Sequence, residues 1–120
     1  MMNPEVKKLW VAALRDPATK QGRYVLENLN GEQCCLGVLC RIAEREGIIK
    51  QSDIAKRTAR LKPAVTFCNF VDHLPPEVKE WAGVDGLDIV CINRESKSLV
   101  NHNDDGATFP EIADAVESQL

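Results

Sequence analysis

The length and composition of the chain favour one folded domain. Its 120 residues (13.3 kDa) lie near the common size of a single domain. A hydrophobic content of 44% and a charged content of 28% are typical of a globular protein and exclude a disordered one. No apolar stretch approaches the roughly 20 residues that a membrane-spanning helix needs, and the first residues lack the pattern of a signal peptide. We therefore expect one domain over residues 1–120 that stays in the cytoplasm and has no membrane partner.

The charge of the chain opposes binding to duplex nucleic acid, because the net charge is −3 and the pI is about 5.4. The charges are unevenly distributed along the sequence. Residues 41–62 hold seven basic and three acidic residues, whereas the chain after Asn101 holds five acidic residues and neither Lys nor Arg. These segments form either two solvated surfaces that partly neutralise each other, or a basic rim that attracts a small anionic ligand.

The five cysteines form neither a disulfide nor a zinc pattern. Cys34 and Cys35 are adjacent, the number is odd, and no C-x-x-C pair is present, which indicates a reducing compartment. The cysteines and the two histidines also lack the paired spacing of zinc sites, and no phosphate-binding G-x-x-x-x-G-K run occurs. We therefore predict no metal and no cofactor. Free cysteine is among the most buried residue types, so we expect Cys40, Cys68 and Cys91 to be buried.

The first part of the chain predicts a helix followed by a strand. Asn3 and Pro4 are typical of a helix start, and Asp16-Pro17 ends the apolar periodicity that follows. Residues 23–26 read as a short strand, and Asn30-Gly31 indicates a tight turn.

A second helix is predicted from Cys34 to Gly47. Its buried face is defined by apolar residues at helical spacing, and Gly47 is a typical residue just beyond a helix end. The apolar residues are Leu36, Leu39, Cys40 and Ala43. Residues 51–62 allow either a surface helix or a loop.

The last part of the chain predicts two strands and two helices. Residues 65–71 and 87–92 read as strands, and residues 95–98 turn the chain back. A short helix is expected from Pro75-Pro76 to Gly83, and Thr108 to Glu111 matches a capping box that starts the last helix. The fold class is thus α+β: a compact domain of three or four helices with a few short antiparallel strands.

A cysteine at a helix start is a candidate nucleophile, because the positive end of the helix dipole favours the thiolate. We consider Cys34 or Cys35 as the nucleophile, with His102 or His73 as a base. The alternative is a structural role for the cysteine pair. A hydrolase of this kind requires an accessible thiol next to a histidine.

The polar segment Asn101–Gly106 is the second candidate site. It resembles the first half of a calcium loop, but Ile112 stands where that loop needs a bidentate Glu. Two readings remain: a turn whose side chains bond the backbone, or short polar groups that bind a ligand. In both, we expect this segment to lie beside the start of the Cys34–Cys40 helix.

Four stretches together carry a resemblance to a known group. They are P-E-V to W-V-A-A-L-R at residues 4–15, C-C-L-G-V-L-C at 34–40, L-P-x-E-V to W-A-G at 74–83, and N-D-D-G to F-x-E-I-A at 103–113. The chain resembles small uncharacterised proteins that many bacteriophages and prophages encode. The likeness covers nearly the full length, with residues 51–66 matching least. It implies no particular activity, but it implies a phage accessory protein in the bacterial cytoplasm.

In that context the leading hypothesis is a counter-defence protein that binds and sequesters, or cleaves, a small nucleotide immune signal. The expected ligand-binding residues are basic ones near the phosphates and polar ones near the base or ribose: Arg41, Arg45 and Lys56–Arg60, then Asn101, Asn103 and Asp104. A homo-oligomer is expected, because pockets often form at interfaces. The alternatives are an inhibitor that binds a host defence protein through an exposed apolar patch, and the cysteine hydrolase.

Overall fold

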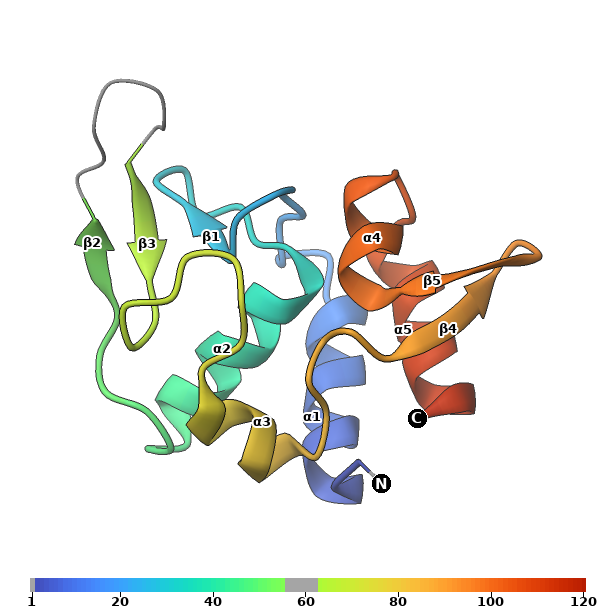
Figure 1. Cartoon of the computed structure of the whole chain (residues 1–120), viewed down its shortest axis with the longest axis horizontal. Helices are drawn as coiled ribbons and strands as arrows, with labels where there is room; N and C mark the ends of the chain where they lie inside the picture. The colour runs from blue at the N-terminus through green and yellow to red at the C-terminus, as the bar shows by residue number, and fades with distance from the viewer. Residues whose placement is uncertain (1, 56–62) are drawn as a thin grey trace.

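The computed structural model describes residues 2–55 and 63–120 and confirms the α+β class. The described residues form five helices, four of them with seven residues or more, and five short strands in two small antiparallel sheets (Figure 1). In chain order these are α1 (Pro4–Arg15), β1 (Glu27–Asn28), α2 (Cys35–Arg45), β2 (Asp53–Ala55), β3 (Ala64–Thr66), α3 (Pro76–Ala82), β4 (Ile89–Ile92), β5 (Glu95–Ser98), α4 (Leu99–Asp104) and α5 (Phe109–Gln119). No helix among them is long and apolar enough to cross a membrane.

Helix α1 begins and ends where its sequence predicts. The Asn3 side chain accepts a hydrogen bond from the Glu5 amide at 3.0 Å, and Pro4 occupies the first turn, where its missing N–H is not needed. The Trp10 ring is fully buried, and its Nε1 donates to the Cys35 carbonyl at 2.9 Å. This bond satisfies the only polar atom of the ring and fixes α1 against the start of α2.

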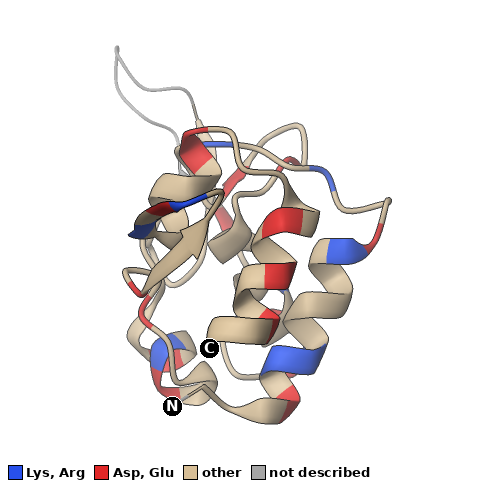
Figure 2. Ribbon diagram, turned by 90° about the vertical axis from the view of Figure 1, so that its right-hand side faces the viewer, with Lys and Arg blue, Asp and Glu red and all other residues tan. Residues whose placement is uncertain are grey.

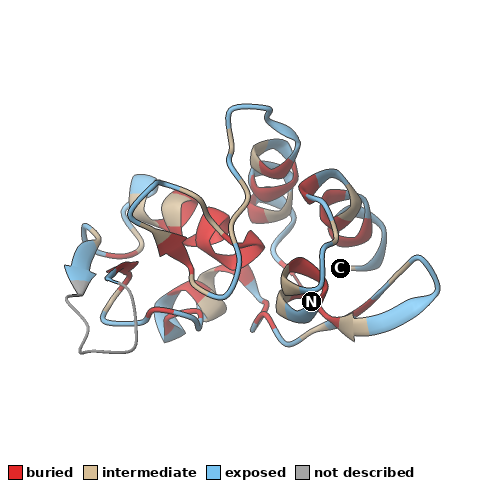
Figure 3. Cartoon of the chain, turned by 90° about the horizontal axis from the view of Figure 1, so that it is seen from above, coloured by how far each residue is buried: buried red, intermediate tan, exposed pale blue. Residues whose placement is uncertain are grey.

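Helix α2 lies at the centre of the core. Residues 35–40 are all buried, so the helix is enclosed on every side over its first half (Figure 3). Its end is a Schellman motif, in which the Ile48 amide donates to Ala43 at 2.9 Å and Gly47 has a φ of 77°. Gly37 faces the backbone of Leu26 so closely that an added Cβ would lie 1.7 Å from the Leu26 carbonyl oxygen. Only glycine allows this approach.

The three-stranded sheet has the order β1-β3-β2, with Val65 of β3 paired to Glu27 on one side and Ile54 on the other. Two strand predictions need correction. Residues 23–26 form no strand, and the chain reaches β1 only at Glu27. The predicted strand 65–71 stops at Thr66, because Phe67 and Phe70 then exchange two backbone hydrogen bonds of 2.9 Å and close a tight turn.

The second sheet is the β4–β5 hairpin, and helix α5 covers the outer edge of β4. The Gln119 side chain donates to the Cys91 carbonyl and accepts from the Cys91 amide, both at 2.8 Å. These bonds satisfy backbone groups that would otherwise be free at the sheet edge to pair with another strand. Cys91 itself is exposed and Cys68 is half-buried, so burial is confirmed only for Cys40 among the three cysteines predicted to be buried.

Helix α5 packs against α1, and the capping box at its start is present. The Thr108 side chain accepts from the Glu111 amide, and the Glu111 carboxylate accepts from the Thr108 amide at 3.0 Å. Acidic residues follow the exposed side of α5 beside the basic residues of α1 (Figure 2). Arg15 pairs there with Asp114 at 2.7 Å and with Glu117 at 3.2 Å. This part of the chain therefore neutralises much of its charge internally.

Replacing Gly37 with alanine should destabilise the protein by about 3 kcal/mol or more, because the methyl group must displace the Leu26 backbone from the core. Gly31 provides a matched control. It has a φ of 79° but no atom near an added Cβ, so Gly31→Ala should cost only about 1 kcal/mol. Urea unfolding followed by circular dichroism measures both values. Equal losses for the two variants would contradict the steric argument.

Candidate functional site

The structure brings the Asn101–Gly106 segment to the start of α2, through the buried side chain of Asn103. Its Oδ1 accepts from the Cys35 amide at 3.2 Å and from Gln21 Nε2 at 2.9 Å, and its Nδ2 donates to the Gly22 carbonyl at 2.9 Å. Asn103 has no exposed surface. It therefore joins three segments inside the fold and offers no free group to a ligand, contrary to its predicted binding role.

The neighbours of Asn103 differ in what they offer to solvent. Residues 101–104 belong to the short helix α4, and the predicted turn is limited to residues 105 and 106 after it. Asp104 is half-buried, and its Oδ1 accepts from the Tyr24 amide at 3.0 Å, which uses the carboxylate to hold the 21–26 loop. Asn101 is exposed. Of the three polar residues predicted to contact a ligand, Asn101 is the one with a fully exposed position.

The two arginines predicted to face phosphates also differ. Arg41 donates from Nε and Nη2 to both oxygens of Glu27, at 2.7 and 2.5 Å, and from Nη1 to Glu44 at 2.8 Å. Burial raises the pKa of Glu27, but the hydrogen bonds from Arg41 and Gln33 outweigh it and hold the pKa below its ordinary value. Arg41 is thus committed to a partly buried ion network, whereas Arg45 is exposed. Lys56–Arg60 lie outside the described residues.

The cysteines at the start of α2 do not meet the requirement of a hydrolase. Cys34 is 2% exposed and Cys35 is fully buried. Burial raises the pKa of Cys34 to about 11 and raises that of Cys35 well above its ordinary value, so both stay protonated at neutral pH. The Cys35 thiol lies 3.7 Å from the Leu99 carbonyl, and His102 Nε2 lies 2.8 Å from the Val90 carbonyl. His102 is therefore bonded to the backbone of β4 and to neither thiol.

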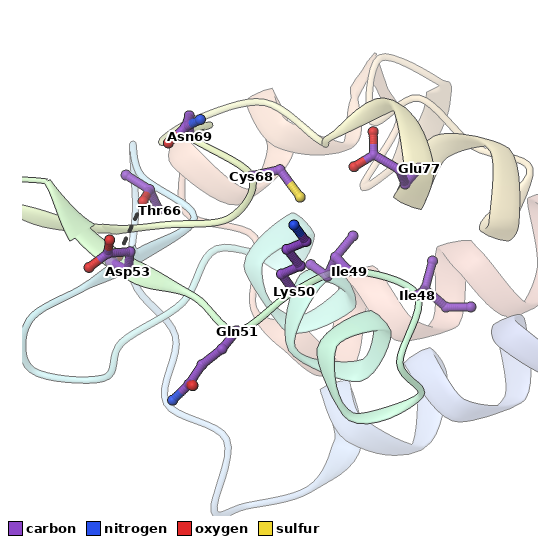
Figure 4. A pocket seen from close by; sticks show the side chains of 9 residues that line it. All are labelled: Ile48, Ile49, Lys50, Gln51, Asp53, Thr66, Cys68, Asn69 and Glu77. Atoms are coloured by element: carbon purple, nitrogen blue, oxygen red, sulfur yellow. Dashed lines mark hydrogen bonds between the residues drawn. The ribbon is translucent and has the colours of Figure 1, made fainter.

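A pocket of about 530 Å³ lies between the end of α2, the three-stranded sheet and the start of α3 (Figure 4). We call it the β2–α3 pocket. Its lining includes Ile49, Lys50, Asp53, Thr66, Cys68 and Glu77. The Lys50 ammonium and the Cys68 thiol point toward each other across it. Lys50 is exposed and forms no ion pair with any residue in 2–55 or 63–120.

The turn that forms one wall of this pocket has an unusual backbone. Cys68 and Asn69 have φ values of 52° and 69°, as the central residues of a type I′ turn require. Each non-glycine residue in this region costs roughly 1 kcal/mol. Burial raises the pKa of Cys68, and the hydrogen bond and charge of Glu77 raise it further, so this thiol ionises less readily than an ordinary cysteine. Within residues 2–55 and 63–120, no cluster of three His, Cys, Asp or Glu residues is arranged to hold a metal ion.

The sequence reasoning missed the β2–α3 pocket because it read residues 65–71 as one strand. The signal that identifies the turn is Asn69 between the aromatic residues Phe67 and Phe70, since Asn tolerates positive φ better than most residues. A turn at this position bends the chain so that Cys68 faces Lys50. In a continuous strand over residues 65–71, Cys68 would not be expected to lie near Lys50.

Asn103 and Asn101 provide a matched pair of variants that separate a structural role from a surface role. Asn103→Ala should lower the free energy of unfolding by about 3 kcal/mol, because the Cys35 amide and the Gly22 carbonyl lose their buried partner. Asn101→Ala should change it by less than about 0.5 kcal/mol. Urea unfolding midpoints test both values, and an unaffected Asn103→Ala variant would refute the structural role.

Thiol labelling of the folded protein should follow exposure. Cys91 should react first with a thiol reagent such as iodoacetamide, and Cys34, Cys35 and Cys40 should react only after unfolding, since burial keeps them protonated and inaccessible. Mass spectrometry of peptides after timed labelling gives the order, and a Cys91→Ser variant is the control. Rapid labelling of Cys34 or Cys35 would restore the nucleophile hypothesis.

Comparisons with known proteins place the chain in a family. No curated protein and no solved structure matches it. A family model described as "Domain of unknown function (DUF8296)" matches residues 2–120. The match spans both sheets and all five helices of the described residues. The chain therefore belongs to the DUF8296 family.

Proposed function

We propose that the protein is a phage-encoded counter-defence protein that sequesters a small anionic nucleotide signal in the bacterial cytoplasm, and that it binds the signal in the β2–α3 pocket. The observation that carries the proposal is Lys50. Its ammonium has no carboxylate partner among the described residues and points into the pocket. A lysine in that position suits a phosphate group, which it contacts as a point charge.

The size and lining of the pocket support a nucleotide-sized ligand. Its volume of about 530 Å³ lies within the usual range for small-molecule sites, roughly 300 to 1,000 Å³. Ile48 and Ile49 contribute apolar surface against which a base can pack, and Gln51 and Asn69 contribute amide groups. The pocket thus combines an apolar wall, amides and a cation, the three features that a nucleotide needs.

The two carboxylates of the pocket restrict which part of the ligand lies where. Asp53 and Glu77 would repel a phosphate but accept hydrogen bonds from ribose hydroxyls or from a base amino group. The phosphate therefore belongs at Lys50, and the sugar or base belongs near the carboxylates. A bare inorganic anion would gain only the Lys50 contact, so it should bind far more weakly than a nucleotide.

Sequestration fits the described groups better than cleavage does. The thiol in the pocket is protonated, and neither histidine lines it. His73 is exposed and paired with Asp72 at 2.6 Å, whereas His102 is bonded to β4. A cleaving enzyme needs an acid or base within hydrogen-bond reach of the scissile group, and in this pocket that role would fall to Lys50, Asp53 or Glu77.

A protein-binding inhibitor is the second candidate, and Tyr24 favours it. Its side chain is 71% exposed although its backbone has a φ of 70°, an uncommon conformation for a bulky residue. The bond from its amide to Asp104 holds it there. An exposed Tyr next to Arg23 on a fixed loop has the composition of a binding hot spot. This candidate predicts that Tyr24→Ala, and not a change at Lys50, removes activity against the host.

Native mass spectrometry tests the proposal, with the protein incubated with a panel of cyclic and ADP-ribose-type nucleotides. We expect one nucleotide to bind stoichiometrically without conversion. Lys50→Ala should weaken its binding by roughly tenfold or more, because one charge-assisted contact is lost. Lys8→Ala, an exposed lysine of α1, should leave it unchanged. No mass shift across the panel would refute the proposal, and a converted nucleotide would replace sequestration with catalysis.

A further inference from the structure

The hydrogen bonding of His102 determines which of its two ring nitrogens is free. The residue is 4% exposed, and its Nε2 lies 2.8 Å from the Val90 carbonyl oxygen. A carbonyl can only accept, so Nε2 carries the hydrogen, and in the neutral ring Nδ1 has a lone pair. No described residue donates to Nδ1. Every fully buried side-chain nitrogen or oxygen among the described residues has a hydrogen-bond partner. Nδ1 has none, so it must be accessible to solvent.

His102 lines a cavity of about 210 Å³ at the end of the molecule that carries β4, β5, α4 and α5. We call it the His102 cavity. Asn93, Glu95, Lys97, Asp105 and Glu111 also line it. The buried imidazole thus provides an unpartnered acceptor within a strongly polar cavity.

The charges around the cavity favour a cation. Three carboxylates line it against one ammonium. Hydrogen bonds from Lys97 hold the pKa of Glu95 and of Asp105 below the ordinary values, and the Thr108 amide does the same for Glu111, so all three are ionised at neutral pH. An anion would meet net repulsion at this end of the molecule.

The cavity already shows the kind of group that its carboxylates accept. The Lys97 ammonium lies 2.8 Å from a Glu95 oxygen and 2.8 Å from an Asp105 oxygen. Each carboxylate keeps further acceptor capacity, since an ionised carboxylate has about four lone-pair sites. A second N–H donor group can therefore enter beside Lys97, with the His102 Nδ1 as an additional acceptor.

We propose that the His102 cavity is a binding site for the ammonium or guanidinium group of a small organic cation, which donates hydrogen bonds to His102 Nδ1 and to the Glu95 or Asp105 carboxylate. The site is separate from the β2–α3 pocket, uses none of its residues, and stands whether or not that pocket binds a nucleotide. A cation suits the negative charge of the lining, and its N–H groups can donate to the Nδ1 lone pair. A phosphate would be repelled by the carboxylates and, when fully ionised, has no hydrogen to donate.

Histidine side-chain NMR tests this inference, because the chain has only two histidines and the second is a built-in control. The ring nitrogens of His102 and of exposed His73 are followed while agmatine, which carries both a guanidinium and an ammonium group, is added to the folded protein. We expect His102 to show the Nε2–H tautomer before addition and a saturable shift of Nδ1 during it. His73 should remain unchanged.

Two variants sharpen the result. Glu95→Gln removes one exposed carboxylate of the cavity and should weaken agmatine binding roughly threefold to tenfold, whereas Glu80→Gln on α3 should not. Higher salt should weaken binding further. Equal shifts of both histidines, or none, would overturn the inference. A response of His102 to Zn²⁺ but not to agmatine would also overturn it, by making the site one for a metal.

Discussion

The fold depends most on one buried carboxamide. Asn103 joins the start of α2, the loop at Gly22 and helix α4, and it does so where no water can replace a lost partner. In such surroundings a hydrogen bond is strong, and an unpaired group is costly, so the three segments are held in one arrangement. Gln21 extends this hydrogen-bond network to α5, because its side chain donates to the Ala107 carbonyl and accepts from the Phe109 amide at the start of that helix. A residue that looks like a ligand contact in the sequence is therefore the internal connector of the domain.

A second constraint lies two residues further along α2, at Gly37. Gly37 lets the Leu26 backbone contact the helix. The next residue, Glu27, accepts hydrogen bonds from Nε and Nη2 of Arg41. The close approach positions the carboxylate, and the arginine neutralises it in a partly buried place where an unpaired charge would be unstable. The Phe67 ring lies 5.2 Å from the same guanidinium, which ties the end of β3 into the network. Together the two constraints hold α2 in one position at the centre of the domain. The polar groups that remain free to bind ligands lie at the two ends of the molecule.

Four of the five described helices, all except α4, could be predicted from the sequence because their signals are local. Asn3-Pro4, Gly47 and the Thr108–Glu111 box act within one turn of the backbone, and each is found in its predicted role. The strands were predicted less well. The predicted strand 87–92 is confirmed as β4, but a segment of two or three residues carries too little periodicity, and β1 exists only through its pairing with Val65. The same limit applies to the site. The sequence placed the polar segment beside α2, but whether Asn103 points inward depends on partners some 70 to 80 residues away, Cys35 and Gly22.

The two cavities share a backbone feature. Each is bordered by a two-residue turn in which side-chain-bearing residues take positive φ, Cys68-Asn69 at one and Asn93-Arg94 at the other. Away from the cavities, the turn after β1 uses Gly31 for the same backbone region at almost no steric cost. Strain of roughly 1 kcal/mol per residue is tolerated when a rigid core holds the turn, and here it brings Cys68, Asn69 and Asn93 into the linings. The two turns lie at opposite ends of the domain (Figure 1), with α2 and α1 between them. Because Asn103 and Gly37 hold α2, and the Trp10 bond holds α1 against it, we expect a ligand at one end not to disturb the other, so the two proposed sites should act independently.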